Sequence, residues 1–378
     1  MRSLAVLLLI GSLSRPAAAQ VRMTRAELEG AAQKDSNDPV LHYNLAQAYA
    51  REKRGREAKR EYLAAMRIDP QFEPAVVALA RMAEAGRPMA IILRVCNRYV
   101  LIGGRPPDQN DSTTLLFQRA FMLDPLQDIR EGWRFPDYWE STCRRAVDHF
   151  QHGDYRWARD QFDTVLAKMA QKNDTDPGIA SIRWYHLLAS VNLGDYDRAI
   201  EDGEALLDHA LRKEIADSIR PDERLSHEYE WVLAHLHERV QHDQEAERLY
   251  KRAVEDNLGQ YMAHVELANI YEAQNRLVEA MTERELAMAA DVGDASLELQ
   301  AGLTYEYARH FAEADTVLRQ AITDNPRETR SYYVLGLVDL QLGKADDARK
   351  AFDQFIALAP SRYTTMLDDA RRRRAALN

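Results

Sequence analysis

Two adjacent stretches near the C-terminus decide the fold: 295-ASLELQAGLTYEYARHFAEADTVLRQAITDNPRE-328 and 329-TRSYYVLGLVDLQLGKADDARKAFDQFIALAPSR-362. Each is 34 residues long, and the two align without a gap. They share glycine at the eighth position, alanine at the twentieth and proline at the thirty-second: Gly302 and Gly336, Ala314 and Ala348, Pro326 and Pro360. A fixed period of this length indicates a repeat protein.

The same register continues towards the N-terminus through residues 261–294 and 227–260. Alanine fills both small positions there: Ala234 and Ala268 at the eighth, Ala246 and Ala280 at the twentieth. Each unit reads as two helices, and small side chains at these positions let the two backbones approach where the helices cross. The closing proline ends the second helix. The pattern predicts four tandem helical hairpins over residues 227–362.

Further copies precede this block. Residues 39–72 form one clear unit, which ends at Pro70. Residues 139–213 hold two divergent units, with the turns Gly153-Asp154-Tyr155 and Gly194-Asp195-Tyr196 between their helices. Residues 363–378 are too short for another unit, and we expect a C-terminal capping helix, because the terminal units of such arrays need a cover.

These units resemble tetratricopeptide repeats over about two-thirds of the chain. The resemblance implies an all-α fold, a right-handed α-solenoid of tetratricopeptide-type helical hairpins. Residues 73–138 fit less well, since a first helix from Glu73 to Gly86 is followed by the loop signal at residues 103–107. We interpret 73–138 as a degenerate unit with an inserted loop. Aromatic residues between Trp133 and Trp139 cluster just at its end.

The resemblance also implies a concave surface, lined by the first helices at repeat positions 2, 5, 9, 12 and 13. The partner-binding residues predicted on this basis are Tyr43, Gln47, Trp231, His235, Asn269, Glu272, Leu303, Tyr307 and Tyr333. Family members that clamp a C-terminal carboxylate need Lys at position 5 and Asn at position 9. Here position 5 is aromatic or aliphatic and only Asn269 matches, so that clamp is excluded. For Leu337 and Leu340, covering by the chain itself is an equal alternative.

An apolar lining of this kind suits an amphipathic helix or an extended apolar segment of a partner protein. The favoured hypothesis is a non-enzymatic interaction scaffold or adaptor that binds a partner segment in the concave groove. The alternative is an accessory subunit of an envelope enzyme or transporter that captures a peptide or a glycan, with the aromatic residues near 133–139 contributing. Homo-oligomerisation through exposed end repeats is a third hypothesis.

The sequence carries no catalytic signature. The phosphate-binding loop, the HExxH metalloprotease motif, the GxSxG elbow and GxGxxG are all missing. His235 and His237 are two residues apart and therefore point to different sides of a helix. We expect no enzyme, no metal site and no cofactor.

Charge and hydropathy exclude two further classes. The net charge of −10 argues against a nucleic-acid binder, whose binding face would be basic. The run Arg371-Arg372-Arg373-Arg374 suits the C-terminal end of a helix, although an anionic lipid or an acidic partner remains open. No internal stretch reaches the roughly 18 apolar residues of a membrane span.

The first residues read as an export signal. Arg2 precedes an apolar run from Leu4 to Ile10, and Ala17-Ala18-Ala19 supplies a cleavage site. We expect residues 1–19 to be a cleaved signal peptide and the mature chain to be periplasmic or secreted. In that oxidising compartment Cys96 and Cys143 could form a disulfide, although two buried thiols are the favoured interpretation.

Overall fold

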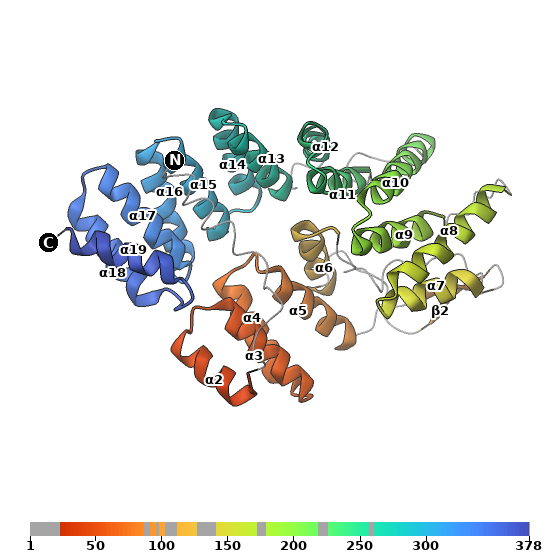
Figure 1. The fold of residues 1–378 in the computed structure, drawn as a ribbon, viewed down its shortest axis with the longest axis horizontal. Helices are drawn as coiled ribbons and strands as arrows, with labels where there is room; N and C mark the ends of the chain where they lie inside the picture. Colours follow the sequence, from red (N-terminus) through yellow and green to blue (C-terminus); the bar gives the residue numbers. More distant parts are fainter. Residues whose placement is uncertain are drawn as a thin grey trace. The chain divides into compact units, whose positions relative to one another are not determined.

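The computed structural model describes residues 23–86, 91–95, 98–102, 112–126, 141–171, 179–217, 226–256 and 261–377. Most of this part of the chain folds into paired antiparallel helices (Figure 1). The predicted fold class, an all-α solenoid of helical hairpins, is confirmed. The N-terminal signal, the loop at 103–107 and the aromatic residues between Trp133 and Trp139 lie outside the described residues.

The C-terminal tandem contains two helices in every 34-residue unit. These are α11 (Ser226–Arg239) with α12 (Asp243–Asp256), α13 (Tyr261–Ala273) with α14 (Leu277–Ala290), α15 (Ala295–Tyr307) with α16 (Phe311–Asp324), and α17 (Thr329–Gln341) with α18 (Ala345–Leu358). The helix α19 (Thr364–Ala375) follows and buries Met366, Leu367 and Ala370. It therefore covers the last unit as a cap.

The earlier hairpins follow the same plan. They are α3 (Pro39–Arg51) with α4 (Gly55–Ile68), α7 (Ser141–Gln151) with α8 (Tyr155–Gln171), and α9 (Ile179–Leu193) with α10 (Tyr196–Asp217). A helix that the repeat did not predict, α2 (Arg25–Lys34), precedes them. Thr24 and Glu27 form a capping box at its start, a sequence signal that could have revealed it.

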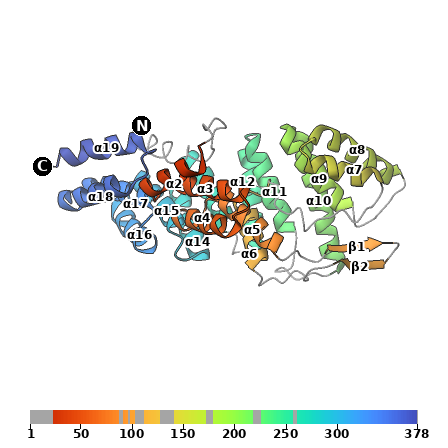
Figure 2. The ribbon, with the colours of Figure 1, turned by 90° about the horizontal axis from the view of Figure 1, so that it is seen from below.

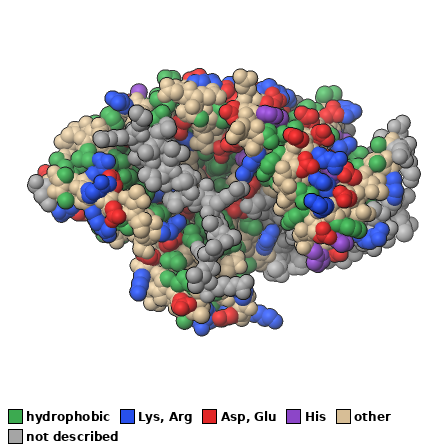
Figure 3. Space-filling view, viewed as in Figure 1, with side chains coloured by type: hydrophobic (Ala, Val, Ile, Leu, Met, Phe, Trp, Pro, Cys, Tyr) green, Lys and Arg blue, Asp and Glu red, His purple; other side chains and the backbone are tan. Residues whose placement is uncertain are grey.

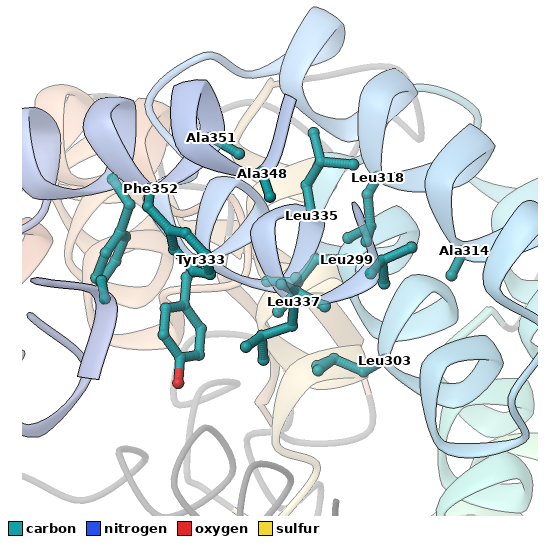
Figure 4. Close-up of a cluster of buried hydrophobic side chains, with 14 of the residues drawn as sticks. Leu299, Leu303, Ala314, Leu318, Tyr333, Leu335, Leu337, Ala348, Ala351 and Phe352 are labelled. Atoms are coloured by element: carbon teal, nitrogen blue, oxygen red, sulfur yellow. The ribbon is translucent and has the colours of Figure 1, made fainter. Parts of the chain in front are cut away.

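Close packing at the eighth repeat position explains why only small residues occur there. A Cβ atom on Gly336 would lie 2.7 Å from the ring of Phe352, and one on Gly302 would lie 2.6 Å from Leu318. Ala268 and Ala234, at the same position in the other two tandem units, are fully buried. Figure 4 shows Phe352 and Leu318 within the resulting apolar cluster.

The turn between the two helices of a unit uses one left-handed residue at the fifteenth position. Glycine takes it in three units, as Gly153, Gly194 and Gly343, with φ between 72° and 80°. Lys53, Gln241, Asn275 and Arg309 take it in the other four, with φ between 58° and 64°. The turn geometry is thus conserved along the chain although the residue type is not, at a modest conformational cost in those four units.

The region that interrupts the repeat contains two helices and a short hairpin. The helix α5 (Glu73–Gly86) is the predicted first helix, and α6 (Ser112–Leu123) follows later. Between them β1 (Ile91–Val95) pairs antiparallel with β2 (Arg98–Ile102), with Ile91 opposite Ile102. These are the only strands in the part of the chain that is described, and the sequence indicated only a loop there.

The chain divides into two compact units. One comprises the described residues up to Leu79 together with those from Ala268 onward, and the other comprises Ala80–Leu267. The first unit is discontinuous in sequence, because the N-terminal hairpin α3–α4 belongs with the C-terminal repeats. Figures 1 and 2 show α2–α4 beside α15–α18.

Candidate partner-binding surface

Trp231, at a predicted concave position of α11, is fully buried. Its ring lies against the rings of His235 and Tyr250, at centroid distances of 4.1 and 5.3 Å. Its indole N–H donates to the carbonyl of Phe121 in α6, at 3.5 Å. The α6 segment therefore covers this concave position, and in this arrangement Trp231 stabilises the fold of the unit Ala80–Leu267.

His235, one turn further along α11, is partly buried. Its Nδ1 atom lies 3.0 Å from the carbonyl of Trp231 and 3.2 Å from the hydroxyl of Tyr250. Burial lowers the pKa of His235, which favours the neutral imidazole near pH 7. Its surroundings are those of a packing residue.

The apolar concave positions of α15 and α17 are also buried. Leu303 is 4% exposed and Tyr333 is 5% exposed, and both belong to the cluster in Figure 4. The hydroxyl of Tyr333 donates to Asp369 of the capping helix at 2.9 Å. Leu337 is buried with them, while Leu340 keeps a half-buried side chain. Covering by the chain itself, one of the two alternatives, thus applies to Leu337.

Tyr43 and Gln47, the predicted concave residues of α3, are half-buried. The amide of Gln47 donates to the hydroxyl of Tyr43 at 3.0 Å. The Tyr43 ring packs against Tyr62 and Phe72, both at centroid distances of 5.7 Å. These contacts hold Tyr43 against its own repeat.

Asn269 and Glu272 of α13 meet at a buried arginine, Arg284 of α14. The Arg284 guanidinium donates to the side-chain oxygens of Asn269 at 2.7 Å and Glu272 at 3.1 Å. It also donates to Gln300 at 2.9 Å and Thr304 at 3.1 Å, both on α15, and Thr304 donates to Glu272. The network joins three successive helices, and Asn269 is its exposed edge.

Sequence reasoning missed Arg284, although a signal was present. It stands at the twenty-fourth repeat position, where the other tandem units carry Tyr250, Leu318 and Phe352. These three are buried apolar packing residues. A cation at such a position requires acceptors from its neighbours, and Asn269, Glu272, Gln300 and Thr304 supply them.

The concave residues that remain accessible lie towards the C-terminal ends of the first helices. We define the first-helix strip as Asn269, Glu272, Glu306, Tyr307, Leu340 and Gln341, on α13, α15 and α17. Asn269 and Gln341 are exposed, and the other four are half-buried. The hydrogen bond from Thr304 to Glu272 places the α13 and α15 parts side by side.

Glu306 differs from the other carboxylate of the strip. Burial raises its pKa, and it has no ion-pair partner within the described residues. Glu272, in contrast, is neutralised by Arg284 at 3.1 Å. A partly desolvated carboxylate with no ion pair among the described residues is a site that a cation from outside could satisfy.

Other polar clusters are internally satisfied. Arg371, Arg372 and Arg373 pair with Asp368 or Asp369, and Arg374 pairs with Asp353 at 2.9 Å. Each arginine of the basic run therefore has an acidic partner within the chain, with Asp369 shared by two of them. On the face in Figure 3, acidic and basic side chains are interspersed.

The Nδ1 atoms of His237 and His242 lie 3.3 Å apart, but no three ligating side chains among the described residues form a metal site.

No helix in the described ranges is long and apolar enough to cross a membrane. Cys96 and the side chain of Cys143 lie outside the described residues, so their disulfide stays a hypothesis.

Comparison with known proteins identifies the repeats. Residues 232–295 and 299–363 match one tetratricopeptide repeat family, and residues 40–72 match another of the same description. No curated protein matches the chain.

Similar solved structures include the C-terminal part of a TPR repeat-containing protein from Cytophaga hutchinsonii. It is 16% identical, with a TM-score of 0.46 over 62% of this chain and 95% of that one. Another is MamA from Desulfovibrio magneticus, 15% identical, with a TM-score of 0.39 over 47% of this chain and 94% of that one. On its family matches, the chain is a tetratricopeptide repeat protein, with repeats of that family in its first hairpin and in its C-terminal tandem.

Proposed function

We propose that this protein is a non-enzymatic interaction scaffold that binds a segment of a partner protein along the first-helix strip, outside the cytoplasm. A tetratricopeptide fold indicates a protein–protein interaction scaffold, because its stacked hairpins present an extended binding surface. The strip extends across three neighbouring first helices. At ~10 Å between helix axes it spans roughly 20 Å, the length of about six residues of an extended segment.

Glu306 carries the proposal. It is a half-buried carboxylate with a raised pKa and no ion-pair partner among the described residues. On the same strip, Tyr307 and Leu340 are half-buried side chains with apolar surface, and Asn269 and Gln341 are exposed amide side chains. The matching segment presents one Lys or Arg to Glu306 and an apolar side chain to Tyr307 and Leu340.

Trp231, Leu303 and Tyr333 are buried, so fewer of the predicted partner-binding residues on the concave face are accessible to a partner. Their exposed fractions of 0 to 5% leave a partner little to touch in this arrangement. Partner contact at these three residues stays a prediction, and the strip is the part of the concave prediction that a partner can reach without rearrangement.

The export part of the proposal rests on the first twenty residues. Arg2, the apolar run from Leu4 to Ile10 and Ala17-Ala18-Ala19 have the order of a signal peptide. Mass spectrometry of the protein from fractionated cells tests it. A mature chain that begins at Gln20 in the periplasm or the medium supports export, and an intact Met1 in the cytoplasm refutes it.

The binding part is tested by affinity capture with quantified partners. Glu306→Gln and Tyr307→Ala are expected to lose the same partner, because one removes the charge and the other the apolar contact. Asp346→Asn, on the exposed start of α18, removes an equal charge away from the strip and serves as the matched control. If both strip variants retain every partner that the wild type retains, the strip is not the binding surface.

A further inference from the structure

The two ends of the chain meet within one compact unit, at the loops between successive repeats. The N-terminal hairpin α3–α4 has one such loop before it, at residues 35–38, and one after it, at residues 69–72. The C-terminal repeats have corresponding loops at residues 325–328 and 359–363. A linear array, in which each repeat contacts only its neighbours, would keep these loops apart.

The first pair of loops is joined by side chains from both ends of the chain. The hydroxyl of Ser361 donates to the carboxylate of Asp35 at 2.6 Å, and the amide of Asn37 donates to the carbonyl of Leu358 at 3.1 Å. Arg362 forms an ion pair with Asp38 at 2.9 Å. Ser361 and Arg362 are exposed, whereas Asp38 is buried.

The second pair is joined in the same manner. The amide of Asn325 donates to the carbonyl of Ile68 at 3.1 Å. The amide of Gln300 donates to the side-chain oxygen of Gln71 at 3.2 Å. Arg330, held by Glu328 at 2.7 Å, lowers the pKa of the half-buried Asp69 by its charge, although desolvation leaves that pKa raised overall. Polar contacts therefore join the two ends of the chain at two places.

The junction differs in character from the packing inside each part. The apolar cluster of the C-terminal repeats draws its residues from α14–α19 and the segments between and after them, and none comes from residues 23–79 in the described structure. The N-terminal hairpin has its own core of Leu45, Tyr49, Tyr62 and the alanines between them. Polar interfaces between separately cored parts of a chain behave like transient interfaces between proteins.

We propose that the N-terminal hairpin is a releasable latch, held on the C-terminal repeats by these polar contacts and opened when their charges are screened. In the closed state it covers the loops at 325–328 and 359–363 and engages Gln300. Since Gln300 also accepts a hydrogen bond from Arg284, the latch reaches the network beneath Asn269 and Glu272. Release of the hairpin exposes these two loops and Gln300, while the hairpin and the C-terminal repeats both stay folded.

Cross-linking in the full-length chain tests the latch. In a background with Cys96→Ser and Cys143→Ser, a short bis-maleimide is applied to the pair Asp35→Cys and Ser361→Cys. The matched control pair is Arg56→Cys and Ser361→Cys. Arg56 lies at the start of α4, roughly 18 Å along the helix from Ile68. The 35–361 pair is expected to cross-link at low ionic strength and the control pair is not.

Charge dependence distinguishes a latch from a fixed part of the array. Arg362→Glu, or 1 M salt, is expected to remove half or more of the 35–361 cross-link, because it breaks or screens the ion pair with Asp38. Arg371→Glu, on the exposed face of α19, is the matched control and should leave the yield unchanged. Circular dichroism confirms that each variant is folded.

Two results overturn the proposal. If the 35–361 pair fails to cross-link, or the control pair cross-links equally, the hairpin is not docked as described. If the cross-link forms but neither Arg362→Glu nor salt reduces it, the hairpin is a permanent part of the array and not a latch.

Discussion

At the scale of single residues, small side chains at the helix crossings explain the repeat best. The sequence predicted this role for the eighth and twentieth positions, and the structure buries Ala234, Ala246, Ala268 and Ala280 completely. These positions could be predicted because the restriction is local: two backbones meet inside one hairpin, so the same side-chain size recurs every 34 residues.

Gly336→Ala tests this crossing directly. The added Cβ would lie 2.7 to 2.9 Å from atoms of the buried Phe352 ring, so the ring or the helix must move. We expect a loss of about 1 to 2 kcal/mol in the free energy of unfolding, the cost of overpacking less the gain in helix propensity. Gly55→Ala is the control, because its Cβ meets no atom within 4 Å. Urea denaturation of both variants provides the comparison, and equal midpoints would contradict the prediction.

Glu298 predicts how the free energy of unfolding depends on pH. Burial and a hydrogen bond with Asp324, with Asp294 nearby, raise its pKa from 4.5 to about 7. The folded state therefore holds a proton that the unfolded chain has released. The stability that this proton confers is fully present below about pH 4.5, and it is lost as the pH rises to about 7.

Glu298→Gln keeps the side-chain shape but cannot ionise. Relative to wild type, the variant should gain about 2 kcal/mol in the free energy of unfolding at pH 8 and nearly nothing at pH 4.5. Thermal denaturation of both proteins across this range measures the difference. A gain that is the same at both pH values would show that Glu298 does not bind the proton.

At the scale of helices, the sequence predicted the helical hairpins, but it did not predict the buried hydrogen-bond network around Arg284. The period of 34 residues located α11–α18 because each helix has the same role in its own unit. Arg284 interrupts an otherwise apolar repeat position, and its partners come from two other helices. Contacts of this kind depend on which helices become neighbours, and a single unit of the repeat does not contain that information.

Arg284→Leu tests whether the network holds α13, α14 and α15 together. Leucine matches the residue at this position in the next unit, Leu318, but leaves Glu272 without its cation. We expect a loss of about 3 kcal/mol, because an uncompensated carboxylate stays behind. The double variant Arg284→Leu with Glu272→Leu should recover most of that loss. Failure of the second substitution to restore stability would argue against the ion pair as the cause.

At the scale of the whole chain, the sequence predicted the tandem repeats but not their division into two compact units, one of which is discontinuous in sequence. Residues 40–72 match a tetratricopeptide repeat family, as the C-terminal units do, yet the sequence of one repeat does not specify which distant repeat it will contact. The polar loops that carry Asp35, Asp38 and Asn325 are ordinary capping and turn sequences when read alone. Their pairing appears only once the chain is folded, and for the same reason the burial of Trp231 by α6 was not foreseen.

Partner binding along the first-helix strip is the central claim, and site-specific photo-cross-linking tests it most directly. A photoreactive amino acid with an aromatic side chain, which keeps the apolar contact, replaces Tyr307 in the full-length protein, and a second protein carries it at Asp346 on α18. Irradiation in intact cells should give a discrete adduct with a partner protein at 307, which disappears with Glu306→Gln, and no such adduct at 346. A protein that cross-links at 346 and not at 307, or an adduct at 307 that is indifferent to Glu306, would contradict the claim.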